Sequence, residues 1–300
     1  MKLVFLGTSS LFPTKDRNHS CIALDIGPET ILFDCGEGTQ RQIRIAKLSP
    51  MKISKILITH WHGDHVLGLP GLLQSFHMNN RKKSLDIFGP KGTKEHVGYM
   101  LKAFEVRLGF KLNIKEINSK KPIKIFETTT YELWAANMEH AVPCIGLSWI
   151  KKSKLRVDTD YLKKFGLKAP HPILKKLQQG KDIVWKGQKI KAKDATYAKS
   201  GKKITYIVDA LPTDTAVELA KDSDVFICES TFSQEYKAAA AERGHMTAKQ
   251  AGKLAKKANV NKLIITHFSQ RFRNIKPLLE EAKRSFKNTI AARDFLEVKV

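Results

Sequence analysis

The stretch Thr59-His60-Trp61-His62-Gly63-Asp64-His65 places four potential metal ligands within six consecutive residues. It follows the apolar run Ile53–Ile58, which we expect to form a buried strand. Two histidines that are two positions apart point to the same side of an extended chain. Gly63 permits a sharp turn, so the aspartate and the last histidine can face a second position as a helix begins over Val66–Met78. Packing gives no reason to crowd imidazoles here, and the pattern favours two adjacent divalent metals.

Length and composition limit the class of protein. Three hundred residues, 42% of them hydrophobic, can build one large domain or two small ones with a sizeable core. No apolar run reaches the roughly 18 residues that a membrane span needs. The four cysteines are scattered without C-x-x-C spacing. This usage predicts reduced thiols in a cytoplasmic protein rather than a disulfide framework.

The chain is strongly basic, with a formal net charge of +24. Residues 151–203 carry 17 lysines and arginines but only four aspartates and no glutamate. Such an excess indicates a polyanionic partner, either nucleic acid or an anionic membrane face, or else a generally lysine-rich proteome. Because this segment has few long apolar runs, we interpret it as a protruding insertion and call it the basic arm.

Alternating strands and helices predict an α/β fold. We expect a first strand over Lys2–Leu6, a hairpin of Ile22–Ile26 and Thr30–Phe33, and further strands that each end in a polar residue. Strand ends of one sheet meet along one edge, where open α/β sheets place their sites. The polar residues that follow the later apolar runs are Glu139, His140, Asp209, Glu229 and His267. Asp34, which closes the hairpin, either supports a metal ligand or caps a turn.

These motifs resemble the metallo-β-lactamase superfamily and, within it, the tRNase Z (ribonuclease Z) family. The superfamily pattern is carried by Asp34-Cys35-Gly36-Glu37-Gly38-Thr39 and by the H-x-H-x-D-H stretch. The family pattern is carried by the P-x-K-x-R-N loop at Pro13–Asn18 and by His267-Phe268-Ser269-Gln270-Arg271-Phe272. The chain departs from the family at Trp61, where a leucine is commoner, and at Cys228-Glu229-Ser230-Thr231, where the family has H-E-A-T.

The resemblance implies an αβ/βα sandwich, in which two facing mixed sheets are flanked by helices. Residues 1–300 would form this single domain, with the basic arm inserted at 151–203. The family's metal roles imply two zinc ions per subunit, with manganese or iron as possible replacements. One zinc would be held by His60, His62 and His140, and the other by Asp64, His65 and His267, with Asp209 bridging the two.

The family's activity is removal of the 3′ trailer from precursor tRNA. The resemblance implies attack of a hydroxide, activated by the two metals, on the scissile phosphodiester. Asp64 would accept a proton, His245 would protonate the leaving ribose 3′ oxygen, and Glu229 would orient His245. Four residues are placed to hold phosphates or the tRNA end: Lys15, Arg17, Asn18 and Arg271.

The resemblance also implies a homodimer, in which the basic arm grips the tRNA away from the active site. Lysines follow phosphates without reading bases, so binding should fall steeply with salt. Two alternatives remain open from the sequence. One is a hydrolase of a small phosphodiester or lactone on the same fold, and the other is a non-catalytic RNA-binding relative.

Overall fold

The computed structural model describes residues 1–300 and divides into two compact units. The first unit comprises Met1–Phe126, Leu133–Trp149 and Lys203–Val300. The second comprises Glu127–Glu132 and Ile150–Lys202. No helix is both long enough and apolar enough to cross a membrane.

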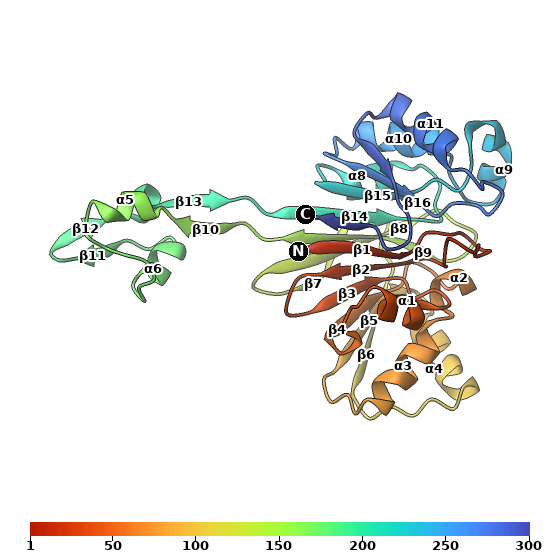
Figure 1. Ribbon diagram of the computed structural model, residues 1–300, viewed down its shortest axis with the longest axis horizontal. Coiled ribbons are helices and arrows are strands. Elements are labelled where there is room, and N and C mark those ends of the chain that lie inside the picture. Colours follow the sequence, from red (N-terminus) through yellow and green to blue (C-terminus); the bar gives the residue numbers. More distant parts are fainter. The chain divides into compact units, whose positions relative to one another are not determined.

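The first unit contains two seven-stranded mixed sheets (Figure 1). The first sheet has the order β18-β1-β2-β3-β4-β5-β6. Its strands β18 to β3 pair antiparallel, and β3 to β6 pair parallel. The predicted hairpin is confirmed as β2 and β3. The bounds are β1 (Lys2–Gly7), β2 (Cys21–Asp25), β3 (Thr30–Phe33), β4 (Ile53–Leu57), β5 (Leu85–Pro90), β6 (Leu112–Ile117) and β18 (Glu297–Lys299).

The second sheet has the order β17-β16-β15-β14-β9-β8-β7. Strands β14, β15, β16 and β17 pair parallel, so their carboxyl ends lie along one edge. The bounds are β7 (Ile123–Glu127), β8 (Tyr131–Met138), β9 (Cys144–Lys151), β14 (Lys202–Ile207), β15 (Val225–Glu229), β16 (Leu263–Thr266) and β17 (Thr289–Ala291).

Helices cover the outer face of each sheet (Figure 1). Helices α1 (Thr39–Ile45), α3 (Leu69–Met78) and α4 (Thr93–Ala103) lie on the first sheet. Helices α8 (Asp214–Ala220), α10 (Ala248–Lys257) and α11 (Lys276–Ser285) lie on the second. The remaining helical elements of this unit are short: α2 (Gly63–Val66), α9 (Lys237–Glu242), η1 (Pro50–Lys52) and η2 (Gln234–Tyr236). The prediction of two facing mixed sheets flanked by helices is confirmed.

The central strands are apolar along their length because both faces of each sheet are covered. Every residue of β3, β15 and β16 is buried. Two hydrophobic clusters result, one between each sheet and its helices. Burial on both faces also explains why these strands end abruptly: the first polar residue marks the edge of the core.

The predicted helix over Val66–Met78 is in fact two helices, α2 and α3. The break occurs at Gly68, whose backbone lies so close to the Gly36 turn that a Cβ there would be 2.1 Å from the Gly36 carbonyl oxygen. Pro70 then occupies the first turn of α3, where its missing N–H costs no hydrogen bond. The sequence pattern did not reveal this close approach between two loops.

The second unit has a hydrophobic core of its own. Its elements are β10 (Lys154–Val157), α5 (Thr159–Lys163), α6 (Leu174–Gln178), β11 (Ile183–Trp185), β12 (Gln188–Ile190), α7 (Ala192–Ala195) and β13 (Thr196–Lys199). Leucines such as Leu162 and Leu177 are fully buried among them. The sequence did not reveal this core, because its apolar residues are dispersed among lysines and gather only on folding.

Candidate metal centre

The predicted metal ligands follow the carboxyl ends of strands from both sheets. His60, His62, Asp64 and His65 follow β4, and His140 follows β8. Asp209 and His267 follow β14 and β16. Asp34, Asp209 and His267 have φ values of 59°, 49° and 61°. This left-handed backbone is uncommon outside glycine and recurs at functional sites.

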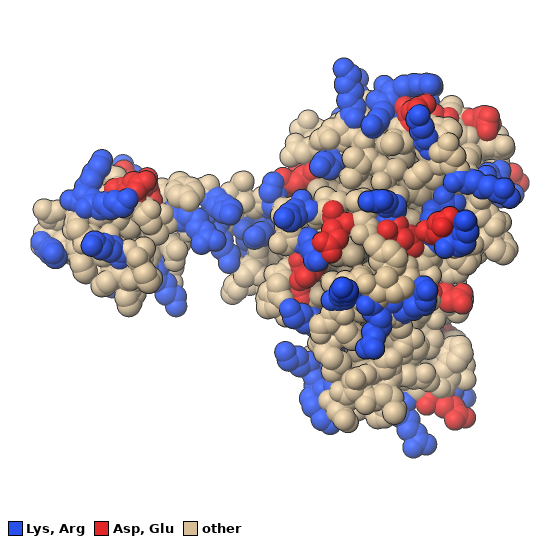
Figure 2. Space-filling model, in the orientation of Figure 1, with Lys and Arg blue, Asp and Glu red and all other residues tan.

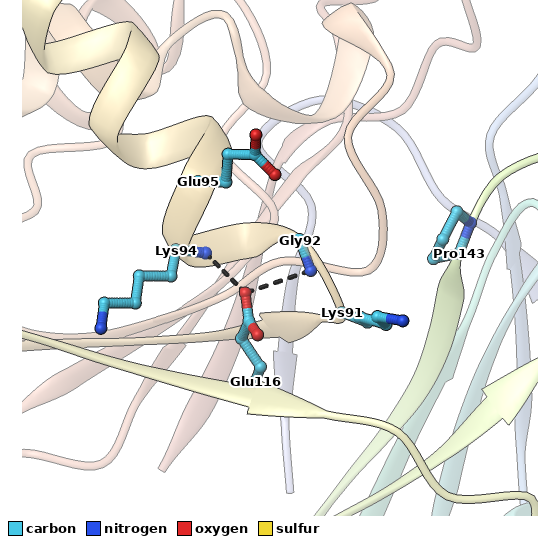
Figure 3. A pocket seen from close by; sticks show the side chains of 6 residues that line it. All are labelled: Lys91, Gly92, Lys94, Glu95, Glu116 and Pro143. Carbon is cyan, nitrogen blue, oxygen red and sulfur yellow. Dashed lines mark hydrogen bonds between the residues drawn. The ribbon is translucent and has the colours of Figure 1, made fainter.

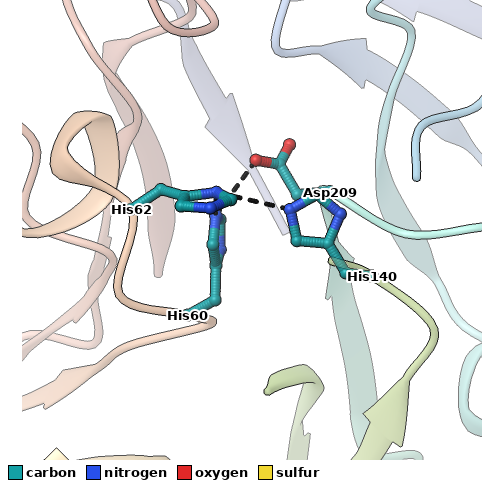
Figure 4. A group of neighbouring side chains, drawn as sticks. All are labelled: His60, His62, His140 and Asp209. Carbon is teal, nitrogen blue, oxygen red and sulfur yellow. Dashed lines mark hydrogen bonds and ion pairs between the residues drawn. The ribbon is translucent and has the colours of Figure 1, made fainter. Parts of the chain in front are cut away.

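His60, His62, His140 and Asp209 form one cluster (Figure 4). Their ligand atoms all lie within 4.8 Å of one another. His62 Nδ1 is 3.0 Å from His60 Nε2 and 3.3 Å from His140 Nε2. His60 Nε2 is 3.1 Å from Asp209 Oδ2. A single cation could contact one atom from each of the four side chains at once: His60 Nε2, His62 Nδ1, His140 Nε2 and Asp209 Oδ2.

Asp64, His65, Asp209 and His267 form a second cluster with the same spread of 4.8 Å. His65 Nε2 lies 3.2 Å from His267 Nε2 and 3.3 Å from both Asp64 Oδ2 and Asp209 Oδ2. Asp209 belongs to both clusters, so its carboxylate joins them. All four residues are buried.

The outer ring nitrogens of two histidines must donate hydrogen bonds. His65 Nδ1 lies 2.8 Å from a carboxylate oxygen of Asp34, and His140 Nδ1 lies 3.1 Å from the carbonyl oxygen of Gly244. Both oxygens only accept, so each Nδ1 carries the proton and each Nε2 keeps its lone pair. Gly244 is needed for this approach, because a Cβ there would lie 2.7 Å from His140 Nδ1.

Two threonine hydroxyls fix two more of the histidines in the same way. Thr59 Oγ1 donates to the Asp34 carboxylate, and Thr231 Oγ1 donates to Glu229 Oε2 at 2.6 Å. Each hydroxyl has only one proton, so it accepts from the histidine beside it. These are His60 Nδ1 at 3.1 Å and His267 Nδ1 at 3.0 Å. Their Nε2 lone pairs also face the clusters.

The residues therefore fit a metal site. Four Nε2 lone pairs converge on buried carboxylates, and nitrogen atoms 3.0 to 3.3 Å apart repel unless a proton or a cation lies between them. Asp209 Oδ1 is buried without a hydrogen bond, although His267 Nδ1 lies 3.0 Å away. Histidine ligands held by an outer carboxylate or carbonyl are typical of metal centres.

The electrostatics of the clusters also favour positive charge. Burial opposes protonation of His65, but Asp64 and Asp34 outweigh it and raise its pKa well above 6.5. Burial and His65 lower the pKa of His60 to about 4, so that ring is neutral. Burial would raise the pKa of Asp64, yet His65 and His267 hold it far below its usual value. Ionised carboxylates and neutral imidazoles are the forms that bind metals, so His65 would give up its Nε2 proton when a metal binds.

His245 and Glu229 lie beside the second cluster. His245 Nδ1 is 3.1 Å from Glu229 Oε2 and 3.6 Å from Asp209 Oδ1. Glu229 is fully buried and is fixed by the backbone N–H groups of Ala210 and Met246. Burial disfavours the charged imidazole, but Glu229 and Asp209 raise the pKa of His245 to about 9. With Nδ1 held by Glu229, Nε2 is the nitrogen that can reach a substrate.

The predicted phosphate-binding residues lie in two neighbouring loops. Arg17 Nη2 lies 3.5 Å from the carbonyl oxygen of Ser269, which joins the Pro13–Asn18 loop to the loop after β16. Lys15 and Arg271 are exposed. The Asn18 amide instead donates to the Glu37 carbonyl oxygen, so this side chain supports the adjoining loop.

A cavity of about 770 Å³ lies near the loop that carries His140 (Figure 3). Pro143, three residues after His140, forms one wall, and the start of α4 forms another. Glu116 accepts hydrogen bonds from the backbone of Gly92 and Lys94. The cavity walls carry two lysines and two glutamates, so their formal charges balance.

Sequence reasoning missed Tyr206, which supports the centre from the second sheet. Its hydroxyl donates to Asp34 Oδ2 at 2.9 Å, and its ring meets Phe33 edge-on at a centroid distance of 5.6 Å. In the sequence it is one more aromatic residue in an apolar strand, and no spacing marks it. The supporting role considered for Asp34 agrees with its contacts to His65 and Thr59.

Comparisons with known proteins identify one matching family model and several similar proteins named ribonuclease Z. A family model described as "Anti-Pycsar protein Apyc1" matches residues 1–160. A ribonuclease Z of Archaeoglobus fulgidus is 37% identical over 303 residues, which cover 100% of this chain and 97% of that protein. A ribonuclease Z of Methanocaldococcus jannaschii is 43% identical over 277 residues, covering 91% and 87% of the two chains.

Solved structures share the fold. Human tRNase Z, short form, superposes with a TM-score of 0.72 at 24% identity, covering 100% of this chain and 99% of that one. The metallo-β-lactamase fold protein YhfI from Bacillus subtilis gives a TM-score of 0.71 at 17% identity, covering 99% and 98% of the two chains. The fold is therefore the metallo-β-lactamase sandwich expected from the motifs.

Proposed function

The chain belongs to the family described as anti-Pycsar protein Apyc1 over residues 1–160 and to the ribonuclease Z family over its full length, and we propose that it uses two zinc ions to cut the 3′ trailer from precursor tRNA. It is a metal-dependent endoribonuclease of tRNA 3′ processing. The observation that carries the proposal is the convergence of four Nε2 lone pairs on the shared carboxylate of Asp209.

Seven residues would hold the two metals. His60, His62 and His140 would bind one ion, Asp64, His65 and His267 the other, and Asp209 both. Imidazole and carboxylate ligands suit zinc, and manganese or iron could replace it. When bound, the two ions would lower the pKa of the attacking water and neutralise the non-bridging phosphate oxygens.

The chain's own residues would handle the protons. Asp64 accepts a proton from the attacking water while the new P–O bond forms. The bond between phosphorus and the ribose 3′ oxygen breaks, and His245 Nε2 gives that oxygen a proton. Glu229 holds His245 through Nδ1 and favours its protonated form. The products are a tRNA with a 3′ hydroxyl and a trailer with a 5′ phosphate.

The basic loops and the basic arm would bind the RNA backbone. Lys15, Arg17, Asn18 and Arg271 would line the path of the tRNA end, with Asn18 contributing through the loop that it supports. On the face shown in Figure 2, lysine and arginine side chains gather along β10 and β13 of the second unit. Charge of this kind binds phosphates without reading sequence. We assign the basic arm the role of a tRNA-binding surface.

Assembly and location follow from the same proposal. We expect a homodimer, as the family resemblance implies, and light scattering of the purified protein would measure its mass. All four cysteines are free and buried, which supports a reducing cytoplasmic location.

The function is tested by mapping the ends of the reaction products. The substrate is a precursor tRNA with a 3′ extension, incubated with the zinc-loaded protein. A single cut after the unpaired nucleotide that follows the acceptor stem, leaving a 3′ hydroxyl on the tRNA, is expected. A protein that hydrolyses a small phosphodiester but leaves the precursor intact would be a small-substrate hydrolase instead.

A further inference from the structure

Arg271 packs against a group of aromatic side chains that the metal centre does not use. Its guanidinium carbon lies 5.2 Å from the ring centroid of Phe232 and 5.0 Å from that of Tyr236. Phe272 meets Tyr236 edge-on at 6.2 Å. We call Arg271 with these three rings, Phe232, Tyr236 and Phe272, the aromatic shelf. The arginine is held by ring faces, a contact that leaves its N–H edge open.

The aromatic shelf is built on two loops that leave the second sheet. Phe232 follows β15 and is 3% exposed, so it forms the base of the shelf. Tyr236 ends η2 and is 38% exposed, although it packs on two other aromatic rings and an arginine. Arg271 is exposed as well. The shelf thus presents part of one tyrosine ring and the open N–H edge of one guanidinium to solvent.

The aromatic shelf adjoins the proposed proton donor. The ring of Phe232 lies 5.9 Å from the ring of His245. Ser269, two residues before Arg271 in the same loop, accepts from Arg17 of the predicted phosphate loop. The shelf therefore adjoins both His245 and the loop that carries Arg17, and its own Arg271 is one of the predicted phosphate-binding residues.

We propose that the aromatic shelf stacks the base of the last nucleotide that the tRNA keeps. The inference rests on the proposed function, because His245 would protonate the 3′ oxygen of that nucleotide's ribose. The base is attached to the same ribose, so it would lie close to His245. The shelf also lies close to His245, because the Phe232 and His245 ring centroids are 5.9 Å apart. Unpaired bases are bound in this way by aromatic rings and by the plane of an arginine, with little preference among the four bases.

The contact would determine where the cut falls. Backbone contacts from lysines let an RNA strand slide by one nucleotide, whereas a stacked terminal base fixes the register of the phosphate over the metals. Tyr236 is the ring that a base can reach, and Phe232 supports it from below. The aromatic shelf is thus a binding subsite for an unpaired nucleobase.

A double-mutant cycle between protein and RNA tests the inference. The protein variant is Tyr236→Ala, and the RNA variant is a 3′-extended precursor tRNA whose unpaired nucleotide after the acceptor stem is abasic. On the intact precursor, we expect Tyr236→Ala to lower kcat/KM by roughly 5- to 150-fold, the range found for loss of one stacked base. On the abasic precursor, we expect wild type and variant to be equal. Tyr236→Phe keeps the ring and should behave as wild type.

Two controls separate the shelf from the rest of the protein. Hydrolysis of bis(p-nitrophenyl) phosphate, which has no base to stack at this position, should be the same in Tyr236→Ala and wild type. Tyr99→Ala removes another exposed tyrosine, on α4 of the first sheet, and should not change cleavage. If Tyr236→Ala lowers kcat/KM equally on intact and abasic precursors, or on neither, the base-stacking role of the aromatic shelf is wrong. Failure of the wild type to cut any precursor would instead overturn the proposed function.

Discussion

Tyr206→Phe removes one oxygen atom that links the two sheets behind the metal centre. The buried Asp34 carboxylate accepts from Tyr206 at 2.9 Å, from the Thr59 backbone N–H at 2.8 Å and from His65 Nδ1 at 2.8 Å. Burial and Asp34 raise the pKa of Tyr206 well above 10, so its hydroxyl always carries the proton that it donates. The phenylalanine ring can keep the edge-on contact with Phe33.

The size of the effect follows from the charge of the acceptor. A hydrogen bond to a charged group contributes about 1.5–3 kcal/mol, and here water cannot replace it because Asp34 is fully buried. For a protein of this size such a loss lowers Tm by roughly 2 to 5 °C. Loss of support behind His65 should also weaken binding of one zinc ion by about 10-fold, as for other groups that orient a metal ligand.

Two measurements and one neighbouring residue test this reasoning. Thermal unfolding of the metal-free protein gives the change in stability, and competition with a chromophoric chelator gives the zinc affinity. Thr205→Val is the matched control, because Thr205 is equally buried on the same strand but bonds to neutral groups, the hydroxyls of Ser148 and Ser223 and the carbonyl oxygen of Leu219. It should leave the zinc affinity unchanged. A Tyr206→Phe protein with wild-type zinc affinity would refute the role given to Tyr206.

Three further outcomes follow from the same structure. Removing metal with a chelator should abolish cleavage of both precursor tRNA and a small phosphodiester, and adding zinc should restore both; activity that survives complete metal removal would contradict the centre. His245→Ala should lower kcat on precursor tRNA by roughly 10²- to 10⁴-fold with little change in KM. It should spare bis(p-nitrophenyl) phosphate, whose leaving group needs no proton, so an equal loss on both substrates would argue against a proton donor. Deleting residues 154–193 should weaken binding of precursor tRNA and flatten its dependence on salt, measured by filter binding, while hydrolysis of a small phosphodiester continues.

The fold was predictable because both sheets are covered on both faces. Each central strand is a short apolar run that stops at a polar residue, and that pattern alone indicated α/β layers. The break between α2 and α3 was not predictable, since it depends on how closely Gly68 approaches Gly36, a contact between segments 32 residues apart. The core of the second unit was missed because its leucines are spread among lysines.

In the candidate site, too, residues marked by local sequence patterns were predicted and residues brought together only by folding were not. The H-x-H-x-D-H stretch was recognisable because its ligands are close together in the sequence, and the later candidates were found because each follows an apolar run. The support behind the ligands comes from Tyr206, Thr231 and Gly244, single residues of common types whose contacts span from 36 to 172 positions. Only the folded chain brings these residues to the histidines, and no spacing in the sequence announces them.

The central claim is that two metals, joined by Asp209, cut precursor tRNA. It is tested most directly by zinc content and cleavage measured together, for wild type and for Asp64→Ala, in zinc and in manganese. We predict two zinc ions per wild-type chain and one cut per precursor, with the cut lost in Asp64→Ala. A wild-type protein that binds two ions and leaves the precursor whole, or an Asp64→Ala protein that cuts at the wild-type rate, would contradict the account.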